Sequence, residues 1–207
     1  MSERAPGVRL LVLSGSVRAG SLNAAALRAA SRLLTAADGT ARIEPLLIDR
    51  LPFFDADLAD AVARQDAAGP GTVHEVARVT AALRAADGLL VATPEYNGNP
   101  PGLLLNALDW LSRDLATGPL LGLPVATISA SPGSGGGANA QARLRGVLSR
   151  CGARLAAPAV ALDRAGQRLD TSGEFTDAHS TGLIQGAVRP LLTACRAVAA
   201  RRAKVRP

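Results

Sequence analysis

The sequence predicts an α/β fold in which a doubly wound, five-stranded parallel sheet carries helices on both faces. Three observations lead to this class. Short apolar runs alternate along the chain with Ala- and Leu-rich stretches that are long enough to form helices. The clearest runs are apolar at nearly every position, as in strands that are buried on both faces of a sheet. Each of those runs ends at a loop rich in Gly, Ser, Pro or Asn.

Five runs are predicted to form the strands. Those that begin at Val8, Gly88 and Pro124 are the most continuously apolar and are closed by turn residues. The run that begins at Arg42 is more mixed, and Pro158 interrupts the last run because proline cannot donate a ladder hydrogen bond. In chain order, the predicted strands cover residues 8–13, 42–48, 88–93, 124–130 and 155–162.

Five stretches are predicted to be helical. Pro101 is expected in the first turn of its helix, where its missing N–H costs nothing. Pro190 is expected to kink the closing helix or to mark its boundary. Gly69-Pro70-Gly71 predicts a break, and residues 49–60 and 163–173 predict loops. The predicted helices cover residues 22–37, 74–86, 101–111, 138–151 and 181–202.

Length and composition limit the class of protein. The 207 residues, of which 48% are hydrophobic and 19% charged, can bury a core as a single domain over residues 1–207. Cys151 and Cys195 form no CxxC pair and predict neither a disulfide scaffold nor a metal site. The N-terminus has no signal-peptide pattern, and no apolar run is long enough to cross a bilayer. A cytoplasmic protein is therefore expected.

The formal net charge of +6 is concentrated partly in a basic tail over residues 201–207. Such a tail can bind nucleic acid or an anionic membrane. No aromatic residue lies among these charges, so a stacking platform for single strands is missing. The favoured interpretation is a frayed, solvated C-terminus with neither nucleic acid nor membrane as a partner, although a positive field attracts phosphorylated cofactors.

A polar loop over residues 15–23 joins the first strand to the first helix. It has neither the GxGxxG nor the GK[ST] pattern of phosphate-binding loops. A helix N-terminus presents free N–H groups and a partial positive charge, and this loop adds the polar groups of Ser16, Arg18, Ser21 and Asn23. The set fits a phosphate monoester. The alternative is that Ser21 merely caps the helix.

Two further loops follow the third and fourth strands. Residues 93–102 (TPEYNGNPPG) form a rigid, turning backbone that suits the edge of a planar heterocycle, and Tyr96 is the only tyrosine. Residues 131–141 are rich in glycine, which lets the backbone approach a ligand closely. The alternatives are a plain turn with a packed Tyr96 and a flexible surface turn. All three loops fall at the carboxyl edge of the sheet, where ligands bind in such folds.

These loops resemble the NADPH-dependent FMN reductase family, which includes quinone, chromate and azo-dye reductases. Its motif G-S-x-R-x-x-S-x-N is similar to residues 15–23, and P-E-Y-N-x-x-x-P-G-x-L-x-N-A-x-D-W to residues 94–110. The loop S-P-G-x-x-G-G is similar to residues 131–137, and a further loop of the family to residues 51–58. The resemblance covers nearly the whole chain up to about residue 162.

The resemblance implies a flavodoxin-like fold and an FMN-dependent oxidoreductase. A hydride from NADPH or NADH would reduce the flavin, which would pass electrons to free flavin, a quinone or a similar small acceptor. The implied FMN-binding residues are Ser16, Arg18, Ser21 and Asn23 for the phosphate, Pro94, Glu95, Tyr96, Asn97 and Gly98 for the ring, and Ser131 and Gly133 for its other side. The family also implies a homodimer or homotetramer, with Asp109 and Trp110 near the contact unless Trp110 is ordinary core.

Two positions depart from the family pattern. Leu105 stands where the family often has Lys, and Asn139 stands where many members have Arg, so the choice between NADPH and NADH is open. No protein acid or base is required when the flavin carries the chemistry. We therefore expect no catalytic role for His74, on a helix surface, or for His179, in the late loop. Glu95 and Asp109 have no evident partner.

Two alternatives share the scaffold. A flavodoxin-like electron carrier would bind FMN without a substrate of its own, but such carriers tend to be acidic, and the hydroxyl-plus-Arg first loop differs from theirs. A dedicated biosynthetic flavin reductase is the other alternative. The sequence does not identify the physiological acceptor or choose between dimer and tetramer.

Overall fold

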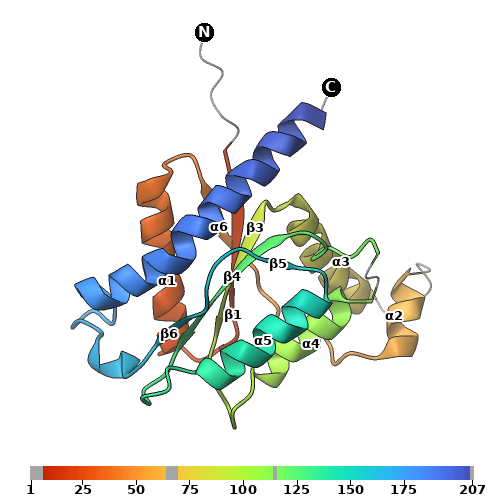
Figure 1. The fold of residues 1–207 in the computed structure, drawn as a ribbon. Coiled ribbons are helices and arrows are strands. Elements are labelled where there is room, and N and C mark those ends of the chain that lie inside the picture. Colours follow the sequence, from red (N-terminus) through yellow and green to blue (C-terminus); the bar gives the residue numbers. More distant parts are fainter. Residues whose placement is uncertain (1–6, 64–69, 114–115, 206–207) are drawn as a thin grey trace.

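A parallel sheet runs through the centre of the computed structural model, which describes residues 7–63, 70–113 and 116–205 (Figure 1). The strand order is β2-β1-β3-β4-β5, and β6 pairs with β4 as well. Because β1 lies between β2 and β3, the chain winds outward in both directions, as in doubly wound folds. The strands are β1 (Arg9–Ser14), β2 (Arg42–Pro45), β3 (Gly88–Thr93), β4 (Pro124–Ala130), β5 (Arg154–Leu155) and β6 (Val160–Leu162).

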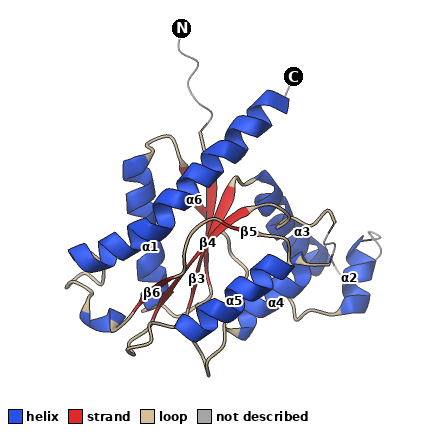
Figure 2. Cartoon of the chain, viewed as in Figure 1, coloured by secondary structure: helices blue, strands red, loops and turns tan. Residues whose placement is uncertain are grey.

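Helices cover both faces of this sheet, which confirms the predicted architecture (Figure 2). Successive strand residues point to opposite faces, so Leu10 joins one core cluster and Leu11 the other. Helices α1 and α6 pack on the first face, and α3, α4 and α5 on the second. The helices are α1 (Leu22–Ala37), α2 (Ala56–Ala63), α3 (Pro70–Ala85), α4 (Gly102–Leu111), α5 (Ala138–Arg150) and α6 (Ala178–Val205), with a short 3₁₀ helix, η1 (Ala165–Gln167).

The last predicted strand is split into two pieces. Arg154 pairs with Pro124 and Val160 pairs with Ile128, so β5 and β6 lie along the same edge of β4. The interruption contains Pro158, as the sequence predicted. The edge strand β2 is also shorter than predicted, since it ends at Pro45 rather than at residue 48.

Three helix boundaries differ from the prediction. The expected loop over residues 49–60 contains the start of α2, which Asp55 caps by accepting a hydrogen bond from the Asp57 N–H at 2.8 Å. Helix α3 begins already at Pro70, a residue that suits a first helical turn, while Gly69 of the predicted break lies outside the described residues. Pro101 immediately precedes α4 instead of lying inside its first turn.

Helix α6 is longer than predicted. It begins at Ala178 because Asp177 accepts a hydrogen bond from the Ser180 N–H at 2.9 Å and so caps the helix. His179 therefore lies in the first turn of α6 and not in a loop. Pro190 lies inside the helix and does not end it. In the described residues no helix is both long and apolar enough to cross a bilayer.

The basic tail is ordered as helix up to Val205, so the expectation of a frayed end is wrong for that part, and Arg206 lies outside the described residues. Arg202 donates to the buried carboxylate of Asp87 at 3.2 Å and to the Arg84 carbonyl at 2.9 Å. The tail thus closes the end of the sheet opposite to the three loops.

Candidate functional site

The three loops predicted from the sequence meet at one edge of the sheet. In the strand register Ser14 pairs with Ala92, and Thr93 pairs with Ser129, so β1, β3 and β4 end at nearly the same level. A cavity of about 380 Å³ opens there. It is lined by Ser16, Arg18, Ser21, Leu22, Asn23, Pro94, Glu95, Tyr96, Ala130, Ser131 and Pro132. The lining includes most of the predicted site residues; Asn97, Gly98 and Gly133 lie beside it in the same loops.

The first loop is held in place by its own hydrogen bonds. The Ser14 hydroxyl donates to the Ser16 carbonyl at 2.9 Å and accepts from the Ser16 N–H at 3.2 Å. The Gly15 N–H donates to the Ala92 carbonyl at 2.8 Å. A Cβ at Gly15 would lie 3.2 Å from Pro94 Cδ, a tight contact, so glycine favours this close approach of the loops after β1 and β3.

The side chains of Ser21 and Asn23 form hydrogen bonds that hold this loop in place. The Ser21 hydroxyl accepts from the Ala24 N–H at 3.2 Å and caps α1, as the alternative interpretation held. The buried Asn23 amide bonds both backbone groups of Ala130, donating to its carbonyl at 3.0 Å and accepting from its N–H at 2.9 Å. These side chains therefore fix α1 against the end of β4. Leu22 and Asn23, the first residues of α1, line the cavity, and N–H groups at such a position have no partner within the helix.

Arg18 is the cation that lines the cavity. Its guanidinium donates to the Gly20 carbonyl at 2.9 Å, and its own N–H donates to the Ser16 hydroxyl at 3.4 Å. It is exposed and pairs with no carboxylate among the described residues. Its charge is therefore available to an anion at the N-terminus of α1.

The second loop forms a tight turn. Tyr96 and Asn99 exchange two backbone hydrogen bonds of 2.9 Å each. Between them Asn97 has φ 52° and Gly98 has φ 73°, and both angles lie in the left-handed region that Asn and Gly tolerate best. Because this turn requires positive φ at two successive positions, Asn and Gly suit those positions. It also leaves the Tyr96 side chain 53% exposed at the mouth of the cavity.

Glu95 connects the second loop to α5. Its carboxylate accepts from the Ala140 N–H at 3.0 Å and from the Asn139 amide at 3.4 Å. The residue that precedes α5 is Gly137, which has no side chain to cap the helix, so Glu95 supplies the cap from another loop. The Ala140 N–H is the main group that holds the pKa of Glu95 below its ordinary value. The sequence did not indicate these two hydrogen-bond partners of Glu95.

The third loop is fixed by the segment that follows β6. The N–H groups of Arg164 and Ala165 donate to the carbonyls of Gly133 and Ser131 at 3.0 and 2.9 Å. The Ser131 hydroxyl also accepts from the Gly133 N–H at 3.2 Å. These bonds tie the third loop to the segment after β6, whereas the alternative interpretation was a flexible surface turn. The sequence analysis missed the role of residues 163–165, and nothing in the polar character of that stretch indicates it.

The remaining candidates lie outside the cavity lining. His74 and His179 are exposed on α3 and α6, and neither lines this cavity. Trp110 is buried and donates to the Pro52 carbonyl at 3.0 Å, which makes it core, while Asp109 is exposed. Among the described residues, no group of His, Cys, Asp and Glu could hold a metal ion. Cys151 and Cys195 are free thiols, both buried.

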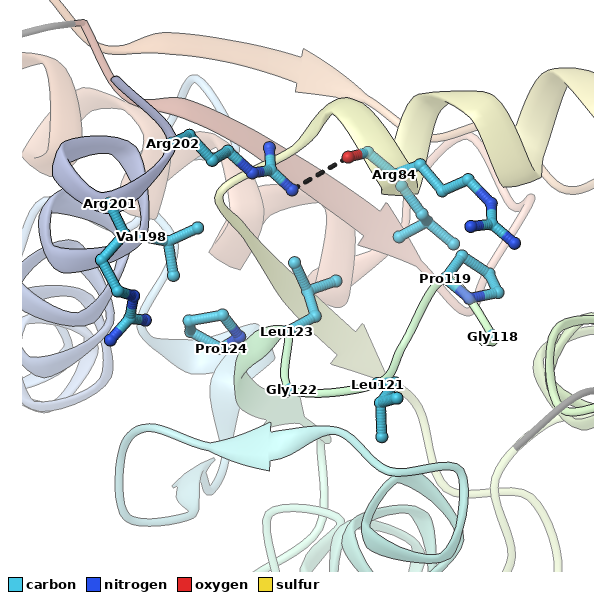
Figure 3. Close-up of a pocket in the computed structure, with 11 residues that line it drawn as sticks. Arg84, Gly118, Pro119, Leu121, Gly122, Leu123, Pro124, Val198, Arg201 and Arg202 are labelled. Carbon is cyan, nitrogen blue, oxygen red and sulfur yellow. Dashed lines mark hydrogen bonds between the residues drawn. The ribbon is translucent and has the colours of Figure 1, made fainter. Parts of the chain in front are cut away.

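Of the other cavities, one lies beside the three loops and another lies far from them. One of about 340 Å³ adjoins the site and is lined by Gly15, Ser16, Val17, Arg18, Tyr96, Pro101, Gly102 and Leu103. Another, of about 360 Å³, lies at the opposite edge of the sheet, between the ends of α3 and α6 and the segment before β4 (Figure 3). Figure 3 shows Arg202 bonded to the Arg84 carbonyl across it. It shares no residue with the three loops.

Comparison with known proteins identifies relatives of the whole arrangement. The family model for NADPH-dependent FMN reductase matches residues 8–167. A quinone reductase from Escherichia coli is 40% identical over 148 residues, which are 72% of this chain and 71% of that protein. An NAD(P)H-dependent FMN reductase from Pseudomonas aeruginosa is 36% identical over 185 residues, or 89% of this chain and 93% of that protein.

Two solved structures are similar to this chain over most of its length. The flavoenzyme FerB, an NAD(P)H:(acceptor) oxidoreductase from Paracoccus denitrificans, has a TM-score of 0.73 at 29% identity, covering 92% of this chain and 98% of its own. A flavodoxin from Pseudomonas aeruginosa, with a TM-score of 0.50 at 21% identity, covers 93% of this chain and 99% of its own. That second likeness concerns the fold alone, which is flavodoxin-like.

Proposed function

This chain belongs to the NADPH-dependent FMN reductase family, and on that basis we propose that the edge where its three loops meet holds FMN and receives NAD(P)H. The protein is an FMN-dependent oxidoreductase that oxidises NAD(P)H and reduces a small acceptor of the quinone or flavin type. One observation carries the assignment of the site: residues from all three loops line a single cavity at the carboxyl edge of the sheet.

The phosphate end of FMN fits the first loop. Helix α1 presents its first N–H groups there, and Arg18 adds a positive charge without a carboxylate partner among the described residues. The Ser16 hydroxyl lines the same cavity. Because Asn23 uses its amide on Ala130, its proposed contact with the phosphate is made by its backbone N–H. Ser21 contributes both the helix cap and a hydroxyl that still has a proton to donate.

The ring of FMN fits between the second and third loops. The proposed ring residues are Pro94, Glu95, Tyr96, Asn97 and Gly98 on one side and Ser131 and Gly133 on the other. The turn at Asn97 and Gly98 keeps backbone groups at the loop surface instead of inside a helix or strand. When bound, FMN supplies the ring that accepts a hydride and later gives up electrons, and the protein supplies position and electrostatics.

A homodimer or homotetramer is the proposed assembly. Several apolar side chains are largely exposed, with 76% of Val17, 58% of Leu47 and 92% of Phe53 accessible to solvent. Val17 and Leu47 line one shallow cavity together with Leu103. Exposed apolar surface of this kind is typical of a contact between subunits. We place the protein in the cytoplasm, where its two unpaired thiols would stay reduced.

An absorbance experiment tests the function directly. Purified protein, reconstituted with FMN where necessary, is expected to show a flavin spectrum that bleaches when NADPH or NADH is added without oxygen. Subsequent addition of a quinone should restore the oxidised spectrum. A bound flavin that neither donor reduces would favour an electron carrier instead. Failure to bind FMN at all would contradict the site.

A further inference from the structure

This inference rests on the proposed function, in which NAD(P)H binds at the site. The electron donor carries negative charge into that site. NADH carries a diphosphate, and NADPH carries an additional 2′-phosphate. Both need positive charge that the FMN phosphate has not already neutralised. Arg18 lies in the loop assigned to FMN. A further cation beside the ring-binding loops would therefore strengthen binding of the donor.

Arg143 of α5 has the required position. Its guanidinium donates to the side-chain oxygen of Asn99, which closes the turn of the second loop. It lies one helical turn beyond Asn139, on the same face of α5, and Asn139 contacts Glu95 of the cavity lining. Arg143 thus stands at the rim of the ring-binding loop and not on a remote surface.

Within the described part of the chain, no ion pair neutralises the charge of Arg143, although that charge acts on the nearby Glu95. Its hydrogen-bond partner Asn99 is neutral, and no carboxylate within ion-pair distance belongs to the described residues. The side chain is exposed, so an incoming anion can reach it. The positive charge of Arg143 acts on the cavity lining, because it contributes to the lowered pKa of Glu95. Arg143 thus adds a positive charge close to Glu95, beside the cavity that Arg18 also lines.

The other cations around these loops are less suited. Arg164 and Arg168 both pair with Asp163, at 3.3 and 3.2 Å, which offsets part of their charge. Arg145 is turned toward the interior and donates to the Thr127 hydroxyl at 3.2 Å and to the Ala157 carbonyl at 3.1 Å.

We infer that Arg143 binds a phosphate of NAD(P)H and is a specificity-determining residue of the reductive half-reaction. The nicotinamide dinucleotide would cross the turn of the second loop with its ring over the flavin site. The shared chemistry is a phosphate oxygen accepting from the guanidinium, and comparing NADH with NADPH distinguishes the diphosphate from the 2′-phosphate.

Binding of NADP⁺ and NAD⁺ to the oxidised, FMN-loaded protein tests this role without turnover. The change in flavin absorbance on titration gives each dissociation constant. Arg143→Gln keeps a donor for Asn99 but removes the charge, and it should raise the dissociation constant at least about fivefold. Arg143→Lys should retain most of the affinity. A rise for both nucleotides identifies the diphosphate, and a rise for NADP⁺ alone identifies the 2′-phosphate.

Matched variants separate this role from a general effect. Arg150→Gln removes the same charge from the exposed far end of α5 and should leave both dissociation constants unchanged. The affinity for FMN and the limiting rate of flavin reduction should be the same in Arg143→Gln as in the parent protein. The difference in nucleotide affinity should shrink as salt is added, because the lost interaction is electrostatic.

Several results would overturn the inference. Unchanged nucleotide affinity in Arg143→Gln removes Arg143 from the donor site. Weakened FMN binding in that variant would show instead that Arg143 only braces the second loop. A rise confined to Arg164→Asn would move the anion site to the third loop. In each of these cases a parent protein that NADPH bleaches preserves the proposed function, whereas a parent that neither donor reduces would contradict both.

Discussion

At the scale of single residues, the polar side chains of the first loop have two different roles. Ser21 and Asn23 are bound to backbone groups, at Ala24 and Ala130, and so define the shape of the site. Arg18 is exposed, and in the described part of the chain its guanidinium bonds only the nearby Gly20 carbonyl. The first pair therefore contributes to the stability of the loop, while the Arg18 charge is available to a ligand.

Arg18→Ala should weaken FMN binding by several-fold or more, because a charge-assisted hydrogen bond to the phosphate is lost. The free energy of unfolding without FMN should change little, since the side chain is exposed. Fluorescence titration with FMN measures the first effect and urea denaturation the second. Arg189→Ala, which removes an exposed charge from α6, serves as the control. Equal FMN affinity in Arg18→Ala and the parent would exclude this role for Arg18.

At the scale of elements, the second loop and helix α5 form one unit. Glu95 caps α5 from the second loop, and Arg143 of α5 bonds Asn99 of that loop. Gly137 cannot cap the helix itself, and a Cβ there would lie 3.0 Å from Ser129 Cβ. The close packing of the third loop on β4 thus makes a cap from elsewhere necessary.

Glu95→Ala should lower the free energy of unfolding by about 1 kcal/mol, the usual effect of losing a helix cap. Glu95→Gln should lose less, because its amide oxygen still accepts from the Ala140 N–H. Thermal or urea unfolding of the two variants measures this difference. Equal losses in both variants would show that the cap depends on the carboxylate charge and not on the hydrogen bond alone.

The same residue predicts a pH dependence. The pKa of Glu95 is lower in the folded protein than its ordinary value of 4.5, so the folded state favours the ionised carboxylate. Its contribution to stability should be complete above about pH 5 and should disappear as the pH falls through the folded pKa. The stability difference between the parent and Glu95→Gln should therefore shrink on acidification. A constant difference would contradict the assignment.

At the scale of the whole molecule, α6 connects the two edges of the sheet. It begins near the third-loop side, packs along α1, and ends beside Arg84 and Asp87 at the opposite edge (Figure 1). Asp87 is 5% exposed and also accepts from the Arg9 N–H at 2.9 Å. The basic tail therefore has a structural partner inside the domain.

Arg202→Ala should lower the free energy of unfolding by about 1 kcal/mol, because the buried Asp87 loses a charged donor but keeps the Arg9 N–H. The partly exposed position of Arg202 keeps this effect modest. Arg201→Ala is the control, since Arg201 is exposed and has no carboxylate partner among the described residues. Urea denaturation of both variants measures the difference. Equal stability of the two would remove the structural role of Arg202.

The sequence by itself determined the fold class, the order of the elements and the three loops, because periodicity, Gly and Pro are local signals. The runs closed by Ser14, Pro94 and Ser131 could be assigned to one edge, since parallel strands share their direction. The family motifs lie in those same loops. The predicted fold was confirmed, and the three loops meet at one edge of the sheet as expected, while the individual FMN contacts stay predictions.

Only the tertiary structure decided which polar groups are already bonded to the protein. The pairing of Asn23 with Ala130, of Glu95 with Ala140 and of Arg202 with Asp87 joins residues far apart in the chain. No local sequence pattern encodes such partners, because they depend on how the helices pack on the sheet. The same limit explains why the predicted free tail proved to be part of a helix and why Arg143 was not noticed in the sequence.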